Sequence, residues 1–414
     1  MKILFTQHGL VNPGGTELFV AEVTLALHAR GHEVAVYAGE AGEPAERLRR
    51  NGVAVVADPR DCPWEPDIIH GQHRIHALKA LAAFPSCPAV LHLHGLLHFL
   101  EKPFIHPRIG RYLVTTPWLA ERWTAGLGLP REKFETVLNH VDTARFPITR
   151  VPPDRPRKAL VFGNSGIGEE QSDLLREACG AAGLELDFAG KVSGRYESVP
   201  GQLLPRYDLV FAVGRCALEA AASGCGVIPV YRNMADELLG TQNYERLRAQ
   251  NMSVRLARHE KLTKAWLIKQ IDRWDGADIG RVAKRIREDA SLDGVANQLE
   301  NIYKRVAADF PLSARQPLEE ELCAALAVLR DEDWQELHRA KQQAFELARR
   351  LHDSENRNTS LEQDVHVMRA EMSKLKHRIG SMESSRSWRL TRPLRAIDEH
   401  WRRQNAGSQR NGKA

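Results

Sequence analysis

Short apolar segments alternate with helix-like segments over about the first 300 residues of this 414-residue chain. The alternation begins with a strand-like segment, KILFT (2–6), followed by a loop with two adjacent glycines and a largely apolar helix-like segment over 16–31. Alternating strands and helices are typical of parallel strands connected by crossing helices. This pattern therefore predicts an α/β fold with doubly wound sheets, and it restricts the fold more than any other feature of the chain.

The alternation divides into two blocks. Strand-like segments of the first block are at 33–39, 52–57, 67–71, 89–95 and 112–116, and those of the second block are at 159–164, 184–190, 208–214 and 226–231. Between the blocks lies TRVPPDRPRK (149–158), whose prolines and charges are typical of an interdomain linker. We therefore predict two Rossmann-like domains, over 1–148 and 149–312, which would bind ligands beyond the carboxyl ends of their strands.

A helical region is expected over 313–385, and a heptad pattern runs through 337–382. Val365 and Ile379 fall at position a, leucines at position d, and Asn358 is a single polar a residue, a combination that favours a parallel two-stranded coiled coil. The g and e residues that would face each other across such a dimer are opposite in sign in four pairs: Arg350–Glu355, Arg357–Glu362, Asp364–Arg369 and Glu371–Lys376. The pattern predicts a parallel homodimer through 337–382, and the alternative is a lone amphipathic helix packed on the body.

The positive charge of the chain is concentrated in its last segment. Residues 386–414 carry eight basic and two acidic side chains. Their net charge of 8 − 2 = +6 exceeds the net charge of +5 of the whole chain. The rest is therefore nearly neutral, which argues against a nucleic-acid-binding body. Over 386–403, four apolar residues (Leu390, Leu394, Ile397 and Trp401) lie on one side of a possible helix among arginines. This arrangement fits an anionic membrane surface, and the alternative is a disordered basic end.

Features of secreted and membrane-spanning chains are absent from the sequence. The first residues do not resemble a signal peptide, and no uncharged apolar run reaches the roughly 18 residues of a membrane span. The six cysteines form no CxxC pair, which favours reduced thiols over disulfides or a zinc site. We expect a cytoplasmic protein, with possible peripheral binding at the inner face of the plasma membrane.

The segment GRCALEAAASGCGVIPV (214–230) contains the first candidate site residue. Gly214 permits a turn after a strand, a helix can begin near Arg215, and Glu219 would lie in its first turns. A carboxylate there can accept hydrogen bonds from the two hydroxyls of a ribose. The alternative is a solvated helix glutamate, the usual environment of this residue type.

The chain resembles the retaining GT-B glycosyltransferases of the family that contains sucrose synthases and bacterial mannosyltransferases. The resemblance covers about residues 1–310 and rests on the following motifs: NPGGTE (12–17), DIIH (67–70), LHLHG (91–95), LVTTPWLAER (113–122), VLNHVDTARF (137–146) and DLVFAVGRCALEAAASGCGVIPV (208–230). It implies two facing Rossmann domains that bind a nucleotide-diphosphate sugar and transfer the sugar with retained configuration, without a metal or other cofactor. The tail segment SSRSWRLTRPLRAI (384–397) resembles a segment of bacterial surface-polysaccharide glycosyltransferases.

The resemblance also implies roles for individual residues. Glu219 would hold the ribose, His94 would meet the donor sugar as the catalytic residue, and Gly14, Gly15 and Thr16 would form the loop near the diphosphate and acceptor. The remaining donor-binding candidates are Gly214, Arg215, Asn164 and Lys191. Asp142 is expected to form a turn rather than to act in catalysis.

The chain departs from the family pattern in three ways. Phe211 stands where the family usually has a second glutamate, and His140 replaces the glycine of an Asn-Gly-Val-Asp turn. Glu169 and Glu170 follow the first strand of the second domain, where the family tends to have an Arg and a Lys that neutralise the leaving diphosphate. We expect a glycosyltransferase acting on a glycan or lipid-linked acceptor in cell-surface polysaccharide or lipopolysaccharide synthesis. The alternative is a weak or inactive GT-B scaffold that acts in assembly through its coiled coil.

Overall fold

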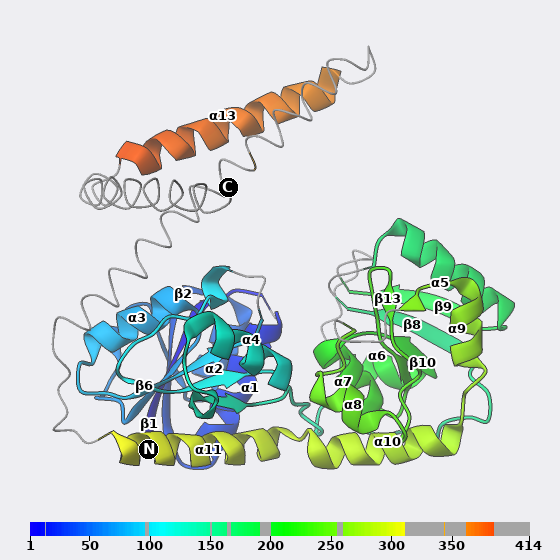
Figure 1. Cartoon of the computed structure of the whole chain (residues 1–414), viewed down its shortest axis with the longest axis horizontal. Helices are drawn as coiled ribbons and strands as arrows, with labels where there is room; N and C mark the ends of the chain where they lie inside the picture. Colours follow the sequence, from blue (N-terminus) through cyan, green and yellow to red (C-terminus); the bar gives the residue numbers. More distant parts are fainter. Residues whose placement is uncertain are drawn as a thin grey trace, which may run out of the picture. The chain divides into compact units, whose positions relative to one another are not determined.

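The computed structural model describes residues 1–12, 14–95, 99–149, 151–163, 167–190, 200–254, 260–310, 343 and 362–384. The chain divides into two compact units, Met1–Pro317 and Leu318–Ala414. The first unit contains two lobes, each built around a parallel sheet (Figure 1).

The first lobe contains a seven-stranded parallel sheet in the order β3-β2-β1-β4-β5-β6-β7. Its strands are β1 (Lys2–Leu10), β2 (Glu33–Ala41), β3 (Ala54–Val56), β4 (Ile68–Gly71), β5 (Ala89–Leu93), β6 (Ile109–Val114) and β7 (Phe134–Thr136). Its helices are α1 (Gly15–Ala29), α2 (Glu43–Arg50), α3 (Arg74–Ala83) and α4 (Pro117–Leu127), with short 3₁₀ turns η1 (Pro59–Asp61), η2 (Phe99–Glu101) and η3 (Arg131–Lys133). The central strands are buried on both faces, as expected for a parallel sheet covered by helices.

The second lobe contains a four-stranded parallel sheet in the order β11-β10-β8-β9. These strands are β8 (Lys158–Phe162), β9 (Glu185–Ala189), β10 (Leu209–Phe211) and β11 (Gly226–Ile228). Its helices are α5 (Glu169–Ala181), α6 (Pro200–Leu203), η5 (Leu204–Arg206), α7 (Gly214–Ala222), α8 (Tyr244–Ala249), α9 (Lys264–Ile271) and α10 (Gly276–Asp289). All four strands match predicted segments, so the expected two-sheet α/β fold is confirmed.

The predicted strand at 226–231 is two strands in different sheets. After β11 the chain passes Pro229 and enters β12 (Val230–Tyr231), which pairs antiparallel with β13 (Met234–Ala235). β13 in turn pairs with β14 (Glu260–Lys261). Proline has no N–H to donate to a strand ladder, so an interruption at Pro229 follows from its chemistry.

Helix α11 (Leu292–Asp309) corrects the predicted domain boundary. The residues 149–312 were assigned to the second domain, but α11 belongs to the hydrophobic core of the first lobe. Tyr303 of α11 is fully buried, and its hydroxyl lies 2.5 Å from Nδ1 of His70 on β4. Figure 1 shows α10 beneath the second lobe and α11 continuing beneath the first, so this pair of helices joins the two lobes.

In the second unit, the structure describes α13 (Glu362–Ser384), which contains the last part of the predicted heptad pattern. Within α13, the seam residues Met372, Leu375, Ile379 and Met382 are half-buried and most residues between them are exposed. The rest of 337–361 and all of 386–414 lie outside the described residues, apart from residue 343. The coiled coil and its dimer therefore stay predictions.

In the part of the chain that the structure describes, no helix has the length and apolarity needed to cross a bilayer.

Candidate functional site

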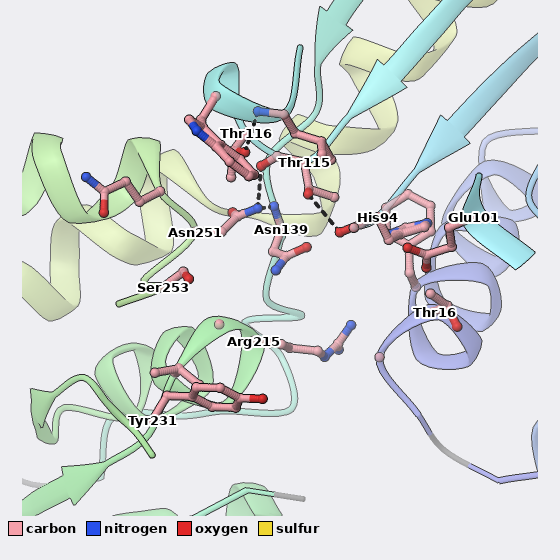
Figure 2. Close-up of a pocket in the computed structure, with 18 of the residues that line it drawn as sticks. Thr16, His94, Glu101, Thr115, Thr116, Asn139, Arg215, Tyr231, Asn251 and Ser253 are labelled. Atoms are coloured by element: carbon pink, nitrogen blue, oxygen red, sulfur yellow. Dashed lines mark hydrogen bonds between the residues drawn. The ribbon is translucent and has the colours of Figure 1, made fainter. Parts of the chain in front are cut away.

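A cavity of about 460 Å³ lies between the two lobes, where the carboxyl ends of both sheets meet (Figure 2). The first lobe contributes residues that follow β1, β5, β6 and β7, and the second contributes Tyr231 of β12 and residues that follow β10 and α8. Its polar lining consists of Thr16, His94, Glu101, Thr115, Thr116, Asn139, His140, Arg215, Tyr231, Gln250, Asn251 and Ser253. This is the position at which open α/β sheets bind their ligands.

The predicted loop of the first lobe lies at the start of α1. Gly15 and Thr16 line the cavity, whereas Gly14 is the residue that caps the helix and lies outside the lining. The first N–H groups of a helix lack partners within it and carry a partial positive charge. The loop can therefore approach an anionic or polar ligand.

His94 follows β5 and borders the cavity. Its Nε2 lies 3.1 Å from Oε1 of Gln72, and its ring stacks on His92 with centroids 4.1 Å apart. Burial, and secondarily the neighbouring His92, hold the pKa of His94 well below its usual value. His94 is therefore neutral near pH 7 and can contact a ligand through hydrogen bonds without a formal charge.

Arg215 is the one arginine or lysine among the described residues that line the cavity. It lies in the first turn of α7, directly after Gly214, whose φ of +61° is a left-handed conformation that glycine adopts readily. Its Nε donates a hydrogen bond to Oε1 of Glu219 over 2.8 Å, and its Nη2 donates one to Oε2 of Glu22. The guanidinium is thus held in a fixed position at the edge of the cavity (Figure 2).

Glu219 lies behind Arg215 rather than on the cavity wall. It is only 5% exposed, is not among the lining residues, and has the guanidinium of Arg215 as its ion-pair partner. Burial raises its pKa, although Arg215 acts in the opposite direction. The alternative of a solvated helix glutamate is wrong, and in this structure the carboxylate orients Arg215.

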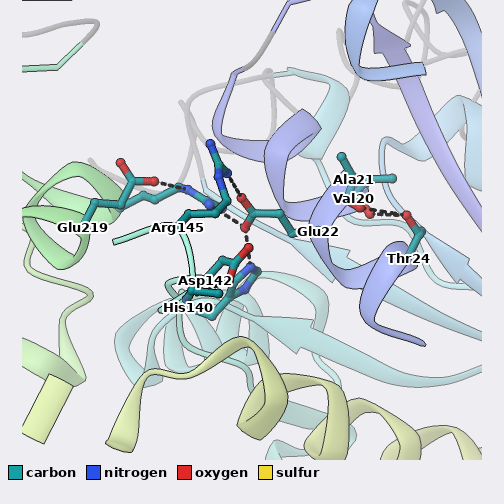
Figure 3. Close-up of polar contacts among 10 residues, drawn as sticks. Val20, Ala21, Glu22, Thr24, His140, Asp142, Arg145 and Glu219 are labelled. Carbon is teal, nitrogen blue, oxygen red and sulfur yellow. Dashed lines mark hydrogen bonds and ion pairs between the residues drawn. The ribbon is translucent and has the colours of Figure 1, made fainter. Parts of the chain in front are cut away.

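Glu22 is a functional candidate that the sequence analysis missed. It is 1% exposed on α1 and accepts hydrogen bonds from His140 over 2.9 Å, from Arg145 over 2.6 Å and from Arg215 (Figure 3). Burial alone would raise its pKa, but Arg215 and His140 outweigh burial and hold the pKa far below the ordinary value. Glu22 is therefore an ionised carboxylate that connects α1 of the first lobe with α7 of the second.

The family departures have structural counterparts. His140 lines the cavity and its Nε2 lies 2.9 Å from Oε2 of Glu22, so the imidazole in place of a glycine becomes part of the network around Glu22. Phe211 is 1% exposed in a core cluster of the second lobe, where a carboxylate would have no described polar partner. Asp142 accepts a hydrogen bond from the N–H of Ala144 two residues later, which is the turn geometry expected for it.

A second set of contacts joins the lobes through Asn251. Its Nδ2 donates to the carbonyl of Thr115 at the end of β6, and its Oδ1 accepts from the N–H of Asn139 over 2.8 Å (Figure 2). Its φ of +53° is unusual for a residue with a side chain. Asn251 therefore holds the segment around Asn139 and the end of β6 together beside the cavity. No motif in the sequence pointed to it.

Two predicted donor-binding residues, Asn164 and Lys191, lie outside the described residues. Among the residues that the structure describes, no group of three or more His, Cys, Asp or Glu side chains is arranged to hold a metal ion. Two of the described histidines near the cavity, His70 and His92, are buried and contact each other. Nε2 of His70 lies 3.2 Å from Nδ1 of His92.

Residues 60–145 match the model of Glycosyltransferase Family 4. No curated protein matches the chain. Among solved structures, a glycosyltransferase from Rickettsia africae is similar with a TM-score of 0.51 at 13% identity, covering 74% of this chain and 98% of that one. The chain is also similar to sucrose-phosphate synthase from Thermosynechococcus elongatus, with a TM-score of 0.47 at 12% identity, covering 74% of this chain and 99% of that one. For HepE from Anabaena in complex with UDP-glucose, the TM-score is 0.45 at 15% identity, covering 74% of this chain and 100% of that one.

Proposed function

We propose that this chain transfers a sugar from a nucleotide-diphosphate sugar to a glycan or lipid-linked acceptor. The family match and the GT-B fold support glycosyltransferase activity. The observation that carries the finer proposal is Arg215, a guanidinium held between two buried carboxylates at the mouth of a cavity between two sheets. A departing nucleoside diphosphate develops negative charge, which groups of the protein must stabilise.

The contacts of Arg215 leave part of its guanidinium for a ligand. Nε and Nη2 are engaged by Glu219 and Glu22, while Nη1 has no partner among the described residues. The N-termini of α1 and α7 border the same cavity and add N–H donors. In our proposal, Arg215 and the start of α7 contact the diphosphate, and His94 meets the donor sugar from the first lobe.

We infer that transfer is retaining and independent of metal, with the donor phosphate accepting the proton of the acceptor hydroxyl. The resemblance to retaining GT-B enzymes motivates this inference, and the guanidinium of Arg215 with the N-terminus of α7 supplies charge stabilisation at the leaving diphosphate. The resemblance implies a ribose contact for Glu219, but in this proposal Glu219 acts by holding Arg215, because it lies behind Arg215 and off the cavity wall. Asn164 and Lys191 remain candidates for the same donor subsite.

We further propose that the enzyme acts in the cytoplasm at the inner face of the membrane, in synthesis of a surface polysaccharide or lipopolysaccharide. The basic amphipathic segment 386–403 would attach it to anionic lipid, and the heptads of 337–382 would form a parallel homodimer. These assignments rest on sequence patterns and on the resemblance of the tail.

A thermal-shift screen of nucleoside diphosphates and nucleotide sugars tests the proposal. A true ligand raises the apparent stability by mass action, by about 2.7 kcal/mol at 100 times its Kd. We expect one nucleotide family to stabilise the wild type and to stabilise Arg215→Gln much less. If no nucleotide binds at millimolar concentration, the chain is the catalytically inactive scaffold, and the enzyme proposal is wrong.

A further inference from the structure

Glu101 is the acidic side chain among the described residues that line the cavity. It ends η2, the 3₁₀ turn between β5 and β6. Figure 2 shows it close to His94 and Thr16 of the first lobe, while Arg215 and Tyr231 approach from the second. The carboxylate therefore lies on the wall opposite the proposed diphosphate contacts.

The structure accommodates this carboxyl group specifically. The backbone of Gly95 hydrogen-bonds to it, and a Cβ on Gly95 would lie 3.2 Å from Oε2 of Glu101, so glycine leaves the space that the carboxylate occupies. Burial, and in addition the nearby Glu17, raise the pKa of Glu101 to about 7. Among the described residues no cation acts on Glu101, so its carboxyl group is open to a hydrogen bond from a ligand.

The first-lobe wall contains no lysine or arginine among its described lining residues. Its other lining side chains are two histidines, four hydroxyl or amide residues and three apolar or aromatic residues: His94, His140, Thr16, Thr115, Thr116, Asn139, Phe19, Trp118 and Leu119. Burial lowers the pKa of both histidines, so they supply no positive charge near pH 7. A phosphate or carboxylate placed beside Glu101, away from the N-terminus of α1, would therefore meet an acidic side chain and no lysine or arginine among the described lining residues of this wall.

We infer that Glu101 is a specificity-determining residue that accepts a hydrogen bond from an acceptor hydroxyl, and that the acceptor group entering the cavity is a neutral sugar. The inference rests on the proposed glycosyl transfer, because it assigns the first-lobe wall to the acceptor. Carboxylates bind vicinal hydroxyls well, and the aromatic rings of Phe19 and Trp118 offer apolar surface for a sugar face.

Titration of Glu101 should be visible in acceptor binding. The other titratable side chains on the elements around it are Glu17 on α1, His94 after β5, the adjacent Lys102, and Arg74, His76 and Lys79 on α3. Ionised Glu101 is the stronger hydrogen-bond acceptor, so affinity for a neutral acceptor should rise with pH through about 7. Replacing Glu17 by Gln removes one repulsive charge and should move this rise to lower pH.

The experiment uses the full chain, the nucleotide sugar that gives the largest thermal shift, and three octyl glycosides as probes: glucoside, glucoside 6-phosphate and glucuronide. We expect the wild type to use the neutral glucoside and to discriminate against both anionic probes. Glu101→Gln should raise the acceptor KM about 10- to 100-fold, as for loss of a charged hydrogen bond, and should flatten the pH dependence. Glu101→Asp should keep the pH dependence, and the exposed Glu121→Gln should behave as the wild type.

The outcomes separate this inference from the proposed function. Nucleotide binding that is equal in Glu101→Gln and wild type shows that the variant is folded and that its donor site is intact. If the variant then keeps the wild-type KM and pH profile, or if the wild type prefers an anionic probe, the inference is overturned and the proposed function stands. If the wild type binds no nucleotide, both are overturned.

Discussion

Glu22 and Arg215 form an ion pair that links helix α1 of the first lobe to helix α7 of the second, across 193 positions of the chain. The carboxylate is 1% exposed and the guanidinium 13% exposed, so both charges are removed from water. Buried charges are tolerated only when they are paired and hydrogen-bonded. Here Arg145, His140 and Glu219 complete the pairing, which makes the mutual position of the lobes depend on this network.

Glu22→Gln should therefore destabilise the chain. Removing one partner of a buried ion pair leaves the other charge without compensation, and such changes cost about 3–5 kcal/mol. We expect a clear fall in the midpoint of urea unfolding. The matched control is Glu46→Gln on α2, where the pair with Arg49 is exposed and the expected change is within about 0.5 kcal/mol. Equal effects of the two substitutions would contradict the role assigned to Glu22.

The fold follows from local patterns, whereas this network does not. Both parallel sheets could be predicted because each strand has its own apolar segment bounded by turns. The strands β7, β13 and β14 were not predicted, since their two or three residues have charged or polar neighbours and form no apolar run. Helix α11 continues the helical pattern of the second block, and nothing local indicates that it packs on the first lobe.

The same distinction applies to the site. Gly15, His94 and Arg215 were predicted from motifs and lie around one cavity. Glu22 stands in the apolar segment FVAEVTLAL, where a lone charge was a detectable signal, but its partners come from distant segments. Glu101 lies in a segment between strands that matches no motif. Its environment arises from Gly95 and Glu17, which only the folded chain brings to it.

Truncation near residue 330 tests the predicted coiled coil. A parallel dimer through 337–382 requires those heptads, so the shortened chain should sediment as a monomer while the full chain sediments as a dimer. Within the full chain, Asn358→Leu should increase coil stability and permit higher oligomers, because a polar residue at position a specifies two strands at a cost in stability. A dimer that persists after truncation would assign dimerisation to another surface.

Acid should destabilise the first lobe through its buried histidines. Burial, with smaller effects of His8 and Lys79, lowers the pKa of His76 to about 4, against about 6.5 in the unfolded chain. Between these values the unfolded state binds a proton that the folded state does not, so stability falls as pH decreases from about 6.5 to 4. His76→Gln should reduce this slope, by up to about 1.4 kcal/mol per pH unit. The exposed His377→Gln on α13 is the control, and an unchanged slope in His76→Gln would contradict the assignment.

Arg215 can be separated from the rest of its network by comparing three substitutions. Arg215→Gln removes the guanidinium at the cavity, and we expect it to weaken binding of the nucleoside diphosphate about 10- to 100-fold, the range for loss of a charged hydrogen bond. Arg215→Lys keeps the charge, but an ammonium group cannot bind both carboxylates and the ligand as the planar guanidinium does, so we expect a partial loss of nucleotide affinity.

Arg145→Gln removes another cation from Glu22 but not from the cavity lining. It should reduce stability while leaving nucleotide affinity close to that of the wild type, as measured by calorimetry. If Arg145→Gln weakens nucleotide binding as much as Arg215→Gln does, the effect comes from the orientation of the lobes, and direct contact between Arg215 and the diphosphate is wrong.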